Sequence, residues 1–257
     1  GGIQSTTNAT RQSTEEELTQ KAAQALDEML HFGVTTCEAK SGYGLATEHE
    51  LKALQVIKNL NDRHHMDIVA TFMGAHLVPA EYKANRAEYI RLVCEEMMPK
   101  VKEQGIAKYC DVFCEADTFT VEESRQVLEA GLKYGLRPKI HADEIEAIGG
   151  SVLAGEIGAI SAEHLIVCPP EGIESMARGG VVACLLPATS FYLGATFAPA
   201  RDMVNAGVPV AMATDFNPGS CPCLNLQFVI NLGCLKYKLT PEEVLTAVTL
   251  NAAAAID

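Results

Sequence analysis

The chain has 257 residues, of which 48% are hydrophobic and 21% are charged, and its formal net charge is -13. This composition predicts one large globular domain, and the acidic excess argues against nucleic acid or an anionic membrane surface as a partner. No run of about 18 apolar residues could cross a bilayer, so we expect a protein without a membrane partner that acts on a small-molecule substrate.

The first element that the pattern predicts is a helix. Ser13 is followed three residues later by Glu16, which is the pattern of a capping box, and apolar residues then recur at helical spacing from Leu18 to Leu30. Gly33 follows the last apolar residue, where a glycine typically ends a helix. The sequence therefore predicts a long amphipathic helix ahead of the first strand.

Three further helix starts follow in chain order. Each has a Thr with a Glu three residues later: Thr47 with Glu50, Thr120 with Glu123, and Thr240 with Glu243. In the last of them Pro241 occupies the first helical position, where proline is favoured. It is the clearest start signal in the sequence.

Strand-like runs alternate with these helices. They lie at 34–40, 67–76, 109–115, 137–143, 159–165, 181–188 and 208–215. Nearly continuous apolar strands separated by crossover helices are typical of a parallel sheet, and repeats of this number predict an α/β protein with a (β/α)8 TIM-type barrel. Such a barrel has eight strands, so either the pattern misses one strand or this chain begins after the first one.

The cysteines indicate the redox state of the protein. Nine is an odd number, and several cysteines lie within the apolar runs: Cys37, Cys110, Cys114 and Cys184. Cysteines in such runs behave as small hydrophobic side chains, which indicates reduced thiols and a cytoplasmic location. No targeting segment is visible at the start of the sequence.

Polar side chains gather where the predicted strands end. Six of the seven strand ends carry an ionisable group: Lys40, His76, Glu115, His141, Glu163 and Asp215. The loops at these ends converge in a (β/α)8 barrel and hold its chemistry. A single His at a strand end is more often structural, but three at strand ends favour a site. The remaining histidines lie in or beside predicted helices, and we expect them to face solvent without a role: His31, His49, His64 and His65.

Three of these side chains are suited to a divalent metal. His141, His164 and Asp215 offer imidazole and carboxylate ligands and leave a position open for water. Such a metal lowers the pKa of bound water to about 7. Asp215 would bind the metal and accept the proton of the attacking water. Glu144, three residues after His141, could donate or accept a proton beside the metal.

At these residues the sequence resembles the imidazolonepropionases of the metal-dependent amidohydrolase superfamily. The motifs that carry the resemblance are GVTT, EAKSGYGL, GAHLVPAEYK, DVFCE, KIHADE, SAEHL, LLPATSFYL and ATDFNPGS. They run through nearly the whole chain. The resemblance implies hydrolysis of 4-imidazolone-5-propanoate to N-formimidoyl-L-glutamate in histidine degradation, with one bound zinc or iron ion.

The resemblance also implies roles for individual residues. His141 and Asp215 would be metal ligands, while Glu144, His164 and Asp215 would act on the substrate and its proton transfers. The substrate pocket would be lined by Tyr43, His76, Glu144, Asn217, Gly219 and Ser220. The hydroxyl of Tyr43 would bind the propanoate tail, and the other side chains and backbone groups would bind in the plane of the ring.

The sequence departs from the family in one respect. The family has two more His ligands, separated by one residue, at the end of its first strand, and an Arg soon after them. No such His pair occurs in these 257 residues. The missing ligands would lie at the end of the missing first strand. We therefore expect residues 1–257 to form an amidohydrolase-type barrel domain that is an internal portion of a longer chain.

Two other functions stay open. A related cyclic amidohydrolase or nucleobase deaminase would share the metal ligands but would lack the motifs KSGYG and DFNPG. A non-catalytic binding or scaffold barrel is the alternative outside enzymes, and the absent His pair is its support. The sequence does not distinguish zinc from iron, and a homodimer is possible.

Overall fold

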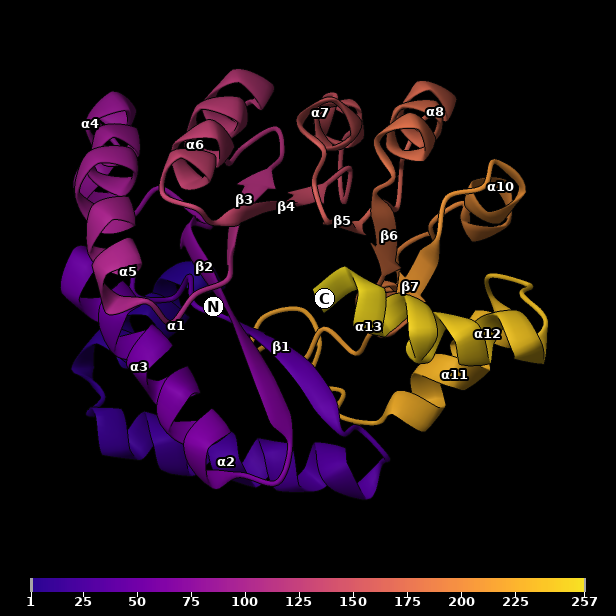
Figure 1. Cartoon of the computed structure of the whole chain (residues 1–257), viewed down its shortest axis with the longest axis horizontal. Coiled ribbons are helices and arrows are strands. Elements are labelled where there is room, and N and C mark those ends of the chain that lie inside the picture. Colours follow the sequence, from indigo (N-terminus) through magenta and orange to yellow (C-terminus); the bar gives the residue numbers. More distant parts are fainter. Residues whose placement is uncertain (1, 257) are drawn as a thin grey trace. The chain divides into compact units, whose positions relative to one another are not determined.

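The computed structural model describes residues 2–256 (Figure 1). These residues form two compact units. The first comprises the described residues up to Phe113 together with Glu122–Arg137, and the second comprises Cys114–Val121 together with the described residues from Pro138 onward. In both units, parallel strands alternate with helices along the chain.

The first unit holds a parallel sheet that is covered by helices. Its elements are α1 (Ile3–Gln12), α2 (Glu15–His31), β1 (Thr36–Lys40), α3 (Thr47–Arg63), β2 (Asp67–Ala75), the short 3-10 helix η1 (Ala80–Tyr82), α4 (Arg86–Leu92), the π-helix η2 (Val93–Met97), α5 (Met98–Gln104), β3 (Tyr109–Cys114) and α6 (Val121–Lys133). Strand β1 pairs with β2 without a break, and the pairing of β2 with β3 shifts register between Phe72 and Ala75. Helix α3 packs on β2, and α2 packs on α3 (Figure 1).

The second unit repeats the same arrangement. Its elements are β4 (Arg137–Ala142), α7 (Gly150–Ile157), β5 (Ser161–His164), α8 (Pro170–Gly179), β6 (Val182–Leu185), α9 (Pro187–Leu193), α10 (Ala200–Asn205), β7 (Val210–Met212), α11 (Leu226–Leu235), α12 (Pro241–Val248) and α13 (Leu250–Ile256). Each strand from β4 to β7 pairs in parallel with the next. Helices α7, α8 and α10 lie along the outside of these strands in Figure 1.

Each of the seven predicted strands contains an observed strand, and every observed strand is shorter than predicted, the last three by the most residues. The backbone explains the early end of β5, where His164 and Leu165 have φ angles of 70° and 55°. Left-handed backbone cannot continue an extended strand, so the chain leaves the sheet there and turns into the loops.

The first helix cap lies one residue later than the sequence pattern suggests. Thr14, not Ser13, caps α2: its hydroxyl accepts the N–H of Glu17 at 3.2 Å, and the carboxylate of Glu17 accepts the N–H of Thr14 at 2.8 Å. The Ser13 hydroxyl instead donates to the Ala9 carbonyl at the end of α1. The capping box of Thr240 and Glu243 is confirmed.

The interpretation of Glu50 as a capping residue is wrong. Ala46 precedes α3 without a side-chain cap, and Glu50 is fully buried. The Glu50 carboxylate accepts the backbone N–H groups of Gly42, Gly44 and Leu45 at 2.8–3.2 Å. Burial raises the pKa of Glu50. This side chain therefore organises the loop after β1 and not the start of α3.

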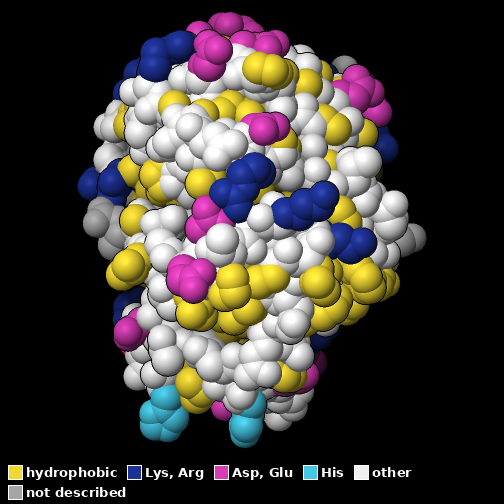
Figure 2. Space-filling model, turned by 90° about the vertical axis from the view of Figure 1, so that its right-hand side faces the viewer, with side chains coloured by type: hydrophobic (Ala, Val, Ile, Leu, Met, Phe, Trp, Pro, Cys, Tyr) yellow, Lys and Arg dark blue, Asp and Glu magenta, His cyan; other side chains and the backbone are white. Residues whose placement is uncertain are grey.

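No cysteine among residues 2–256 takes part in a disulfide. Burial raises the pKa of Cys37 and of Cys168 to about 12, which keeps both thiols protonated. Hydrophobic side chains also reach the surface among charged ones (Figure 2). In the second unit Leu235, Leu245 and Leu250 are each more than half exposed. Among residues 2–256, no helix has the length and apolar character that crossing a membrane would need.

Candidate active site

Three of the predicted site residues come together at the carboxyl ends of β4 and β5. The rings of His141 and His164 have centroids 5.2 Å apart. The Oε2 atom of Glu144 lies 3.7 Å from Nε2 of His164. Both histidines are buried and Glu144 is largely so. The parallel pairing of the two strands, which places Ala142 opposite His164, brings these side chains together.

The backbone at His164 is held in an uncommon conformation. Its φ of 70° is rare for a residue with a side chain and costs on the order of 1–3 kcal/mol. Its Nδ1 atom is buried and has no hydrogen-bond partner among the described residues. Buried polar atoms are nearly always paired, so an orphaned ring nitrogen at a strained strand end indicates a site that a ligand or water completes.

A buried pair of opposite charges lies beside His141. Oε1 of Glu163 is 3.5 Å from Nζ of Lys139 and accepts the hydroxyl of Ser161 at 2.5 Å. Oε2 of Glu163 lies 4.0 Å from Nδ1 of His141. Sequence reasoning gave Lys139 no role, although the period-two alternation of β4 places it on the same face as His141. The charge of Glu163 favours a fixed orientation of the His141 ring.

Asp215 lies in a second group, beyond the end of β7. The buried hydroxyl of Thr189, on α9, donates to Oδ2 of Asp215 at 2.6 Å. The Asn217 side chain donates to the Asp215 carbonyl at 2.8 Å, and its Oδ1 accepts the N–H groups of Gly219 and Ser220 at 2.9 and 2.7 Å. The four predicted residues Asp215, Asn217, Gly219 and Ser220 therefore form one compact loop. Thr189 was missed by sequence reasoning.

The first unit brings Tyr43 and His76 together. Their rings meet edge to face, with centroids 5.1 Å apart. Nδ1 of His76 donates to the Gly42 carbonyl at 2.9 Å, so Nδ1 carries a hydrogen. In the neutral ring Nε2 is then an acceptor. Gly42 has a φ of 104°, and a Cβ there would lie 3.0 Å from the Met73 carbonyl oxygen. Only glycine suits this close loop.

Two other strand-end side chains have structural partners. Nζ of Lys40 lies 2.7 Å from Glu38 and 2.8 Å from Asp111. The carboxylate of Glu115 accepts backbone N–H groups of the loop after β4. These interactions position the end of β1 and the loop after β4.

The remaining histidines are only partly as predicted. His31 and His65 are exposed, whereas His49 and His64 are half-buried. Nε2 of His64 lies 3.1 Å from Asp27, and burial lowers the pKa of His49. The expectation that all four face solvent is therefore wrong for His49 and His64, which are partly covered by other residues of the protein.

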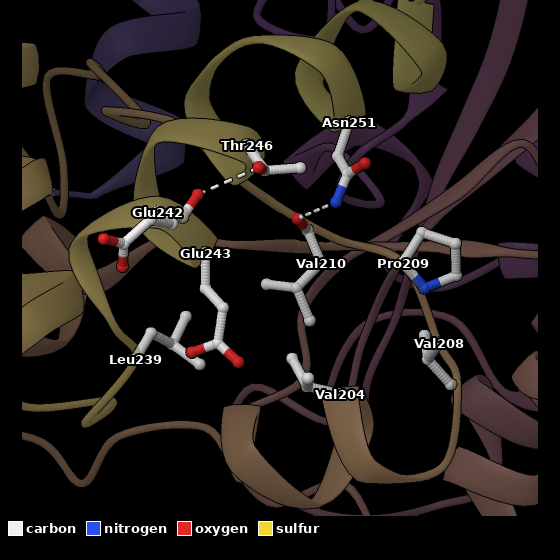
Figure 3. Close-up of a pocket in the computed structure, with 9 residues that line it drawn as sticks. All are labelled: Val204, Val208, Pro209, Val210, Leu239, Glu242, Glu243, Thr246 and Asn251. Atoms are coloured by element: carbon white, nitrogen blue, oxygen red, sulfur yellow. Dashed lines mark hydrogen bonds between the residues drawn. The ribbon is translucent and has the colours of Figure 1, made fainter.

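A cavity of about 310 Å³ lies at the amino end of β7, at the end away from Asp215 (Figure 3). Its walls come from α10, β7, α12 and α13, and Asn251 donates to the carbonyl of Val210 at 2.8 Å. Because the chemistry of a (β/α)8 barrel is placed at the carboxyl ends of its strands, this cavity is separate from the candidate active site.

The sequence matches known proteins along its whole length. A model of the amidohydrolase family matches residues 3–257. An imidazolonepropionase of Alkaliphilus metalliredigens is 57% identical over 258 residues, and one of Shouchella clausii is 54% identical over 256 residues. Both alignments cover 100% of this chain, but the chain spans only 61% and 57% of these relatives. The resemblance to imidazolonepropionases is confirmed.

Solved structures confirm the predicted fold class. A guanine deaminase from C. acetobutylicum with bound guanine has a TM-score of 0.74 at 16% identity and covers 98% of this chain and 64% of its own. An atrazine chlorohydrolase variant from Arthrobacter aurescens TC1, complexed with zinc and atraton, has a TM-score of 0.73 at 16% identity, with coverages of 95% and 60%. These likenesses show the fold alone: parallel strand–helix repeats of a (β/α)8 barrel, seven of which lie within residues 2–256.

Proposed function

Because the chain belongs to the amidohydrolase family, we propose that it carries catalytic residues of an imidazolonepropionase. This enzyme would open the ring of 4-imidazolone-5-propanoate to give N-formimidoyl-L-glutamate in histidine degradation. Relatives of that name at 53–57% identity support the substrate. The observation that carries the proposal is the group of His141, Glu144 and His164 at the ends of two adjacent strands.

We propose that residues of the second unit bind a divalent metal, which would be zinc or iron. His141 offers an imidazole, and a carboxylate oxygen of Glu163 lies 4.0 Å from its Nδ1 atom. Asp215 offers a carboxylate that Thr189 orients. When bound, such a metal supplies Lewis-acid chemistry, which polarises a carbonyl and acidifies water. His141 and Asp215 would be its ligands from this chain.

The remaining chemistry falls to side chains of the same unit. Ring opening adds the oxygen of water to the ring carbonyl carbon, breaks the ring C–N bond and places a proton on the leaving nitrogen. Asp215 would accept a proton from the attacking water. Glu144 would deliver a proton to the leaving nitrogen, and His164, 3.7 Å from Glu144, would hydrogen-bond the carbonyl oxygen as negative charge develops on it.

Recognition of the substrate is proposed from the motifs that carry the resemblance. Asn217, Gly219 and Ser220 would bind the ring through the compact loop after β7. The proposal for Tyr43 and His76 rests on the motifs KSGYG and GAH. We further propose a cytoplasmic enzyme with a small-molecule substrate, and a homodimer is a possible assembly.

Metal content and turnover of a His141→Ala variant test the proposal. The variant is made in the natural full-length protein, beside His65→Ala as a control. His65 is exposed and precedes β2, so it does not belong to the ends of β4 and β5. We expect His141→Ala to lose both the metal and ring opening, and His65→Ala to keep both. Full activity with unchanged metal content in His141→Ala would contradict the assignment.

A further inference from the structure

We propose that Glu115 is a positioning residue for Glu144. The inference rests on the proposed function, because it concerns the placement of the proposed proton donor. Glu115 follows β3, 29 residues before Glu144 in the chain. It is 2% exposed and lies in the second unit with the loop that it binds.

The Glu115 carboxylate collects consecutive backbone donors of the loop after β4. Oε2 accepts the N–H of Glu144 at 3.0 Å and that of Ile145 at 2.9 Å. Oε1 accepts the N–H of Glu146 at 3.0 Å and that of Ala116 at 3.1 Å. Successive N–H groups that converge in this way form a concave site for an anion, and here the anion is a side chain of the protein.

Glu115 is itself held in place by a short turn. Its N–H donates to the Phe119 carbonyl at 3.1 Å, and its carbonyl accepts the N–H of Thr118 at 3.0 Å. The backbone of Glu144 is thus tied to a turn fixed at the end of another strand. Hydrogen bonds to a carboxylate are stronger than those between neutral groups, so the Glu115 side chain is a strong anchor for this loop.

The anchor matters because the side chain of Glu144 must stay close to His164 to act in the proposed reaction. Its Oε2 atom lies 3.7 Å from Nε2 of His164, while Ile145 and Glu146, which follow it, are exposed. An exposed loop without its anchor samples other conformations. A shift of about 1 Å in a reacting group can cost on the order of 100-fold in rate. Glu115 would therefore influence turnover without contact with the substrate.

The variant Glu115→Gln tests this role with little change in shape. An amide has one oxygen and one NH2 group with two N–H donors. The two backbone N–H groups that one of the carboxylate oxygens accepts would therefore face the NH2 group of the glutamine. The matched control is Asp117→Asn, which makes the same change of charge in the same turn on an exposed side chain. Both variants are made in the full-length, metal-loaded protein.

We expect Glu115→Gln to lower kcat by about 10- to 100-fold, with KM and the metal content close to those of the parent. Hydrogen exchange of the amides of residues 144–146, followed by mass spectrometry, should become faster. Asp117→Asn should change none of these quantities. If Glu115→Gln does not fold, Glu115→Asp, which keeps the charge but is one methylene shorter, should show the same changes to a smaller degree.

Two results would overturn the inference: unchanged hydrogen exchange at residues 144–146 in the Glu115 variants, or faster exchange with an unchanged kcat. The exchange measurement needs no substrate. If the parent protein does not act on 4-imidazolone-5-propanoate, the proposed function fails, and the exchange data still decide whether Glu115 anchors the loop of Glu144.

Discussion

The hydroxyl of Thr189 is the most sharply defined contact of a proposed metal ligand. It donates to Oδ2 of Asp215 at 2.6 Å, and Thr189 is fully buried. Thr189→Val replaces this hydroxyl by a methyl group of nearly the same shape, so the main change is the loss of one hydrogen-bond donor. Asp215 would keep its charge and lose the group that orients it.

Two independent magnitudes give the same expected effect. A hydrogen bond to a charged group is worth about 1.5–3 kcal/mol. Removal of a hydrogen-bond partner of a metal ligand typically lowers metal affinity by about 10- to 100-fold, which corresponds to about 1.4–2.8 kcal/mol. We therefore expect Thr189→Val to bind the metal about 10- to 100-fold more weakly than the parent.

The assay is competition with a chelator of known affinity, performed on the full-length protein. Thr189→Ser is the control, because it keeps the hydroxyl and should keep most of the affinity. An affinity of Thr189→Val equal to that of the parent would refute the reasoning, since it would mean that Asp215 either needs no orientation or does not bind the metal.

Three further predictions follow from other contacts. Glu144→Gln should keep the metal and slow turnover by about 100-fold or more, and loss of metal from this variant would show that Glu144 is a ligand. Gly155→Ala should lower the free energy of unfolding by about 1–3 kcal/mol, because a Cβ there would lie 2.2 Å from the Ser175 carbonyl oxygen between α7 and α8; an unchanged denaturation midpoint would argue against this packing. The hydrogen bond from Arg201 lowers the pKa of Glu243 from 4.5 to about 2, so its stabilising effect is complete above pH 4.5 and is lost as the pH falls through 2. Glu243→Gln should therefore flatten the dependence of Tm on pH in that range, and parallel Tm curves for variant and parent would contradict the assignment.

The strands could be predicted from the sequence because each is a short apolar run followed by a polar residue. The same logic placed His141, Glu144 and His164 near one another, since parallel neighbouring strands end on the same side. The exact ends of the strands could not be predicted. The end of β5, for example, depends on left-handed backbone at His164 and Leu165.

The supporting residues could not be predicted because their partners are distant in the sequence. Thr189 binds a carboxylate 26 residues away, and Glu115 binds backbone groups 29–31 residues away. Glu50 has a local pattern that is typical of a helix cap, yet it binds the preceding loop. A local sequence pattern indicates which interactions a side chain can make, and the tertiary structure determines which of them it makes.

The central claim is that this chain belongs to an enzyme that opens the imidazolone ring. Its most direct test is to incubate the purified, metal-loaded full-length protein with 4-imidazolone-5-propanoate, follow the loss of its ultraviolet absorbance, and identify the product by mass spectrometry. We predict complete conversion to N-formimidoyl-L-glutamate without release of ammonia. A stable imidazolone, together with release of ammonia from a nucleobase such as guanine, would contradict the claim and indicate a deaminase.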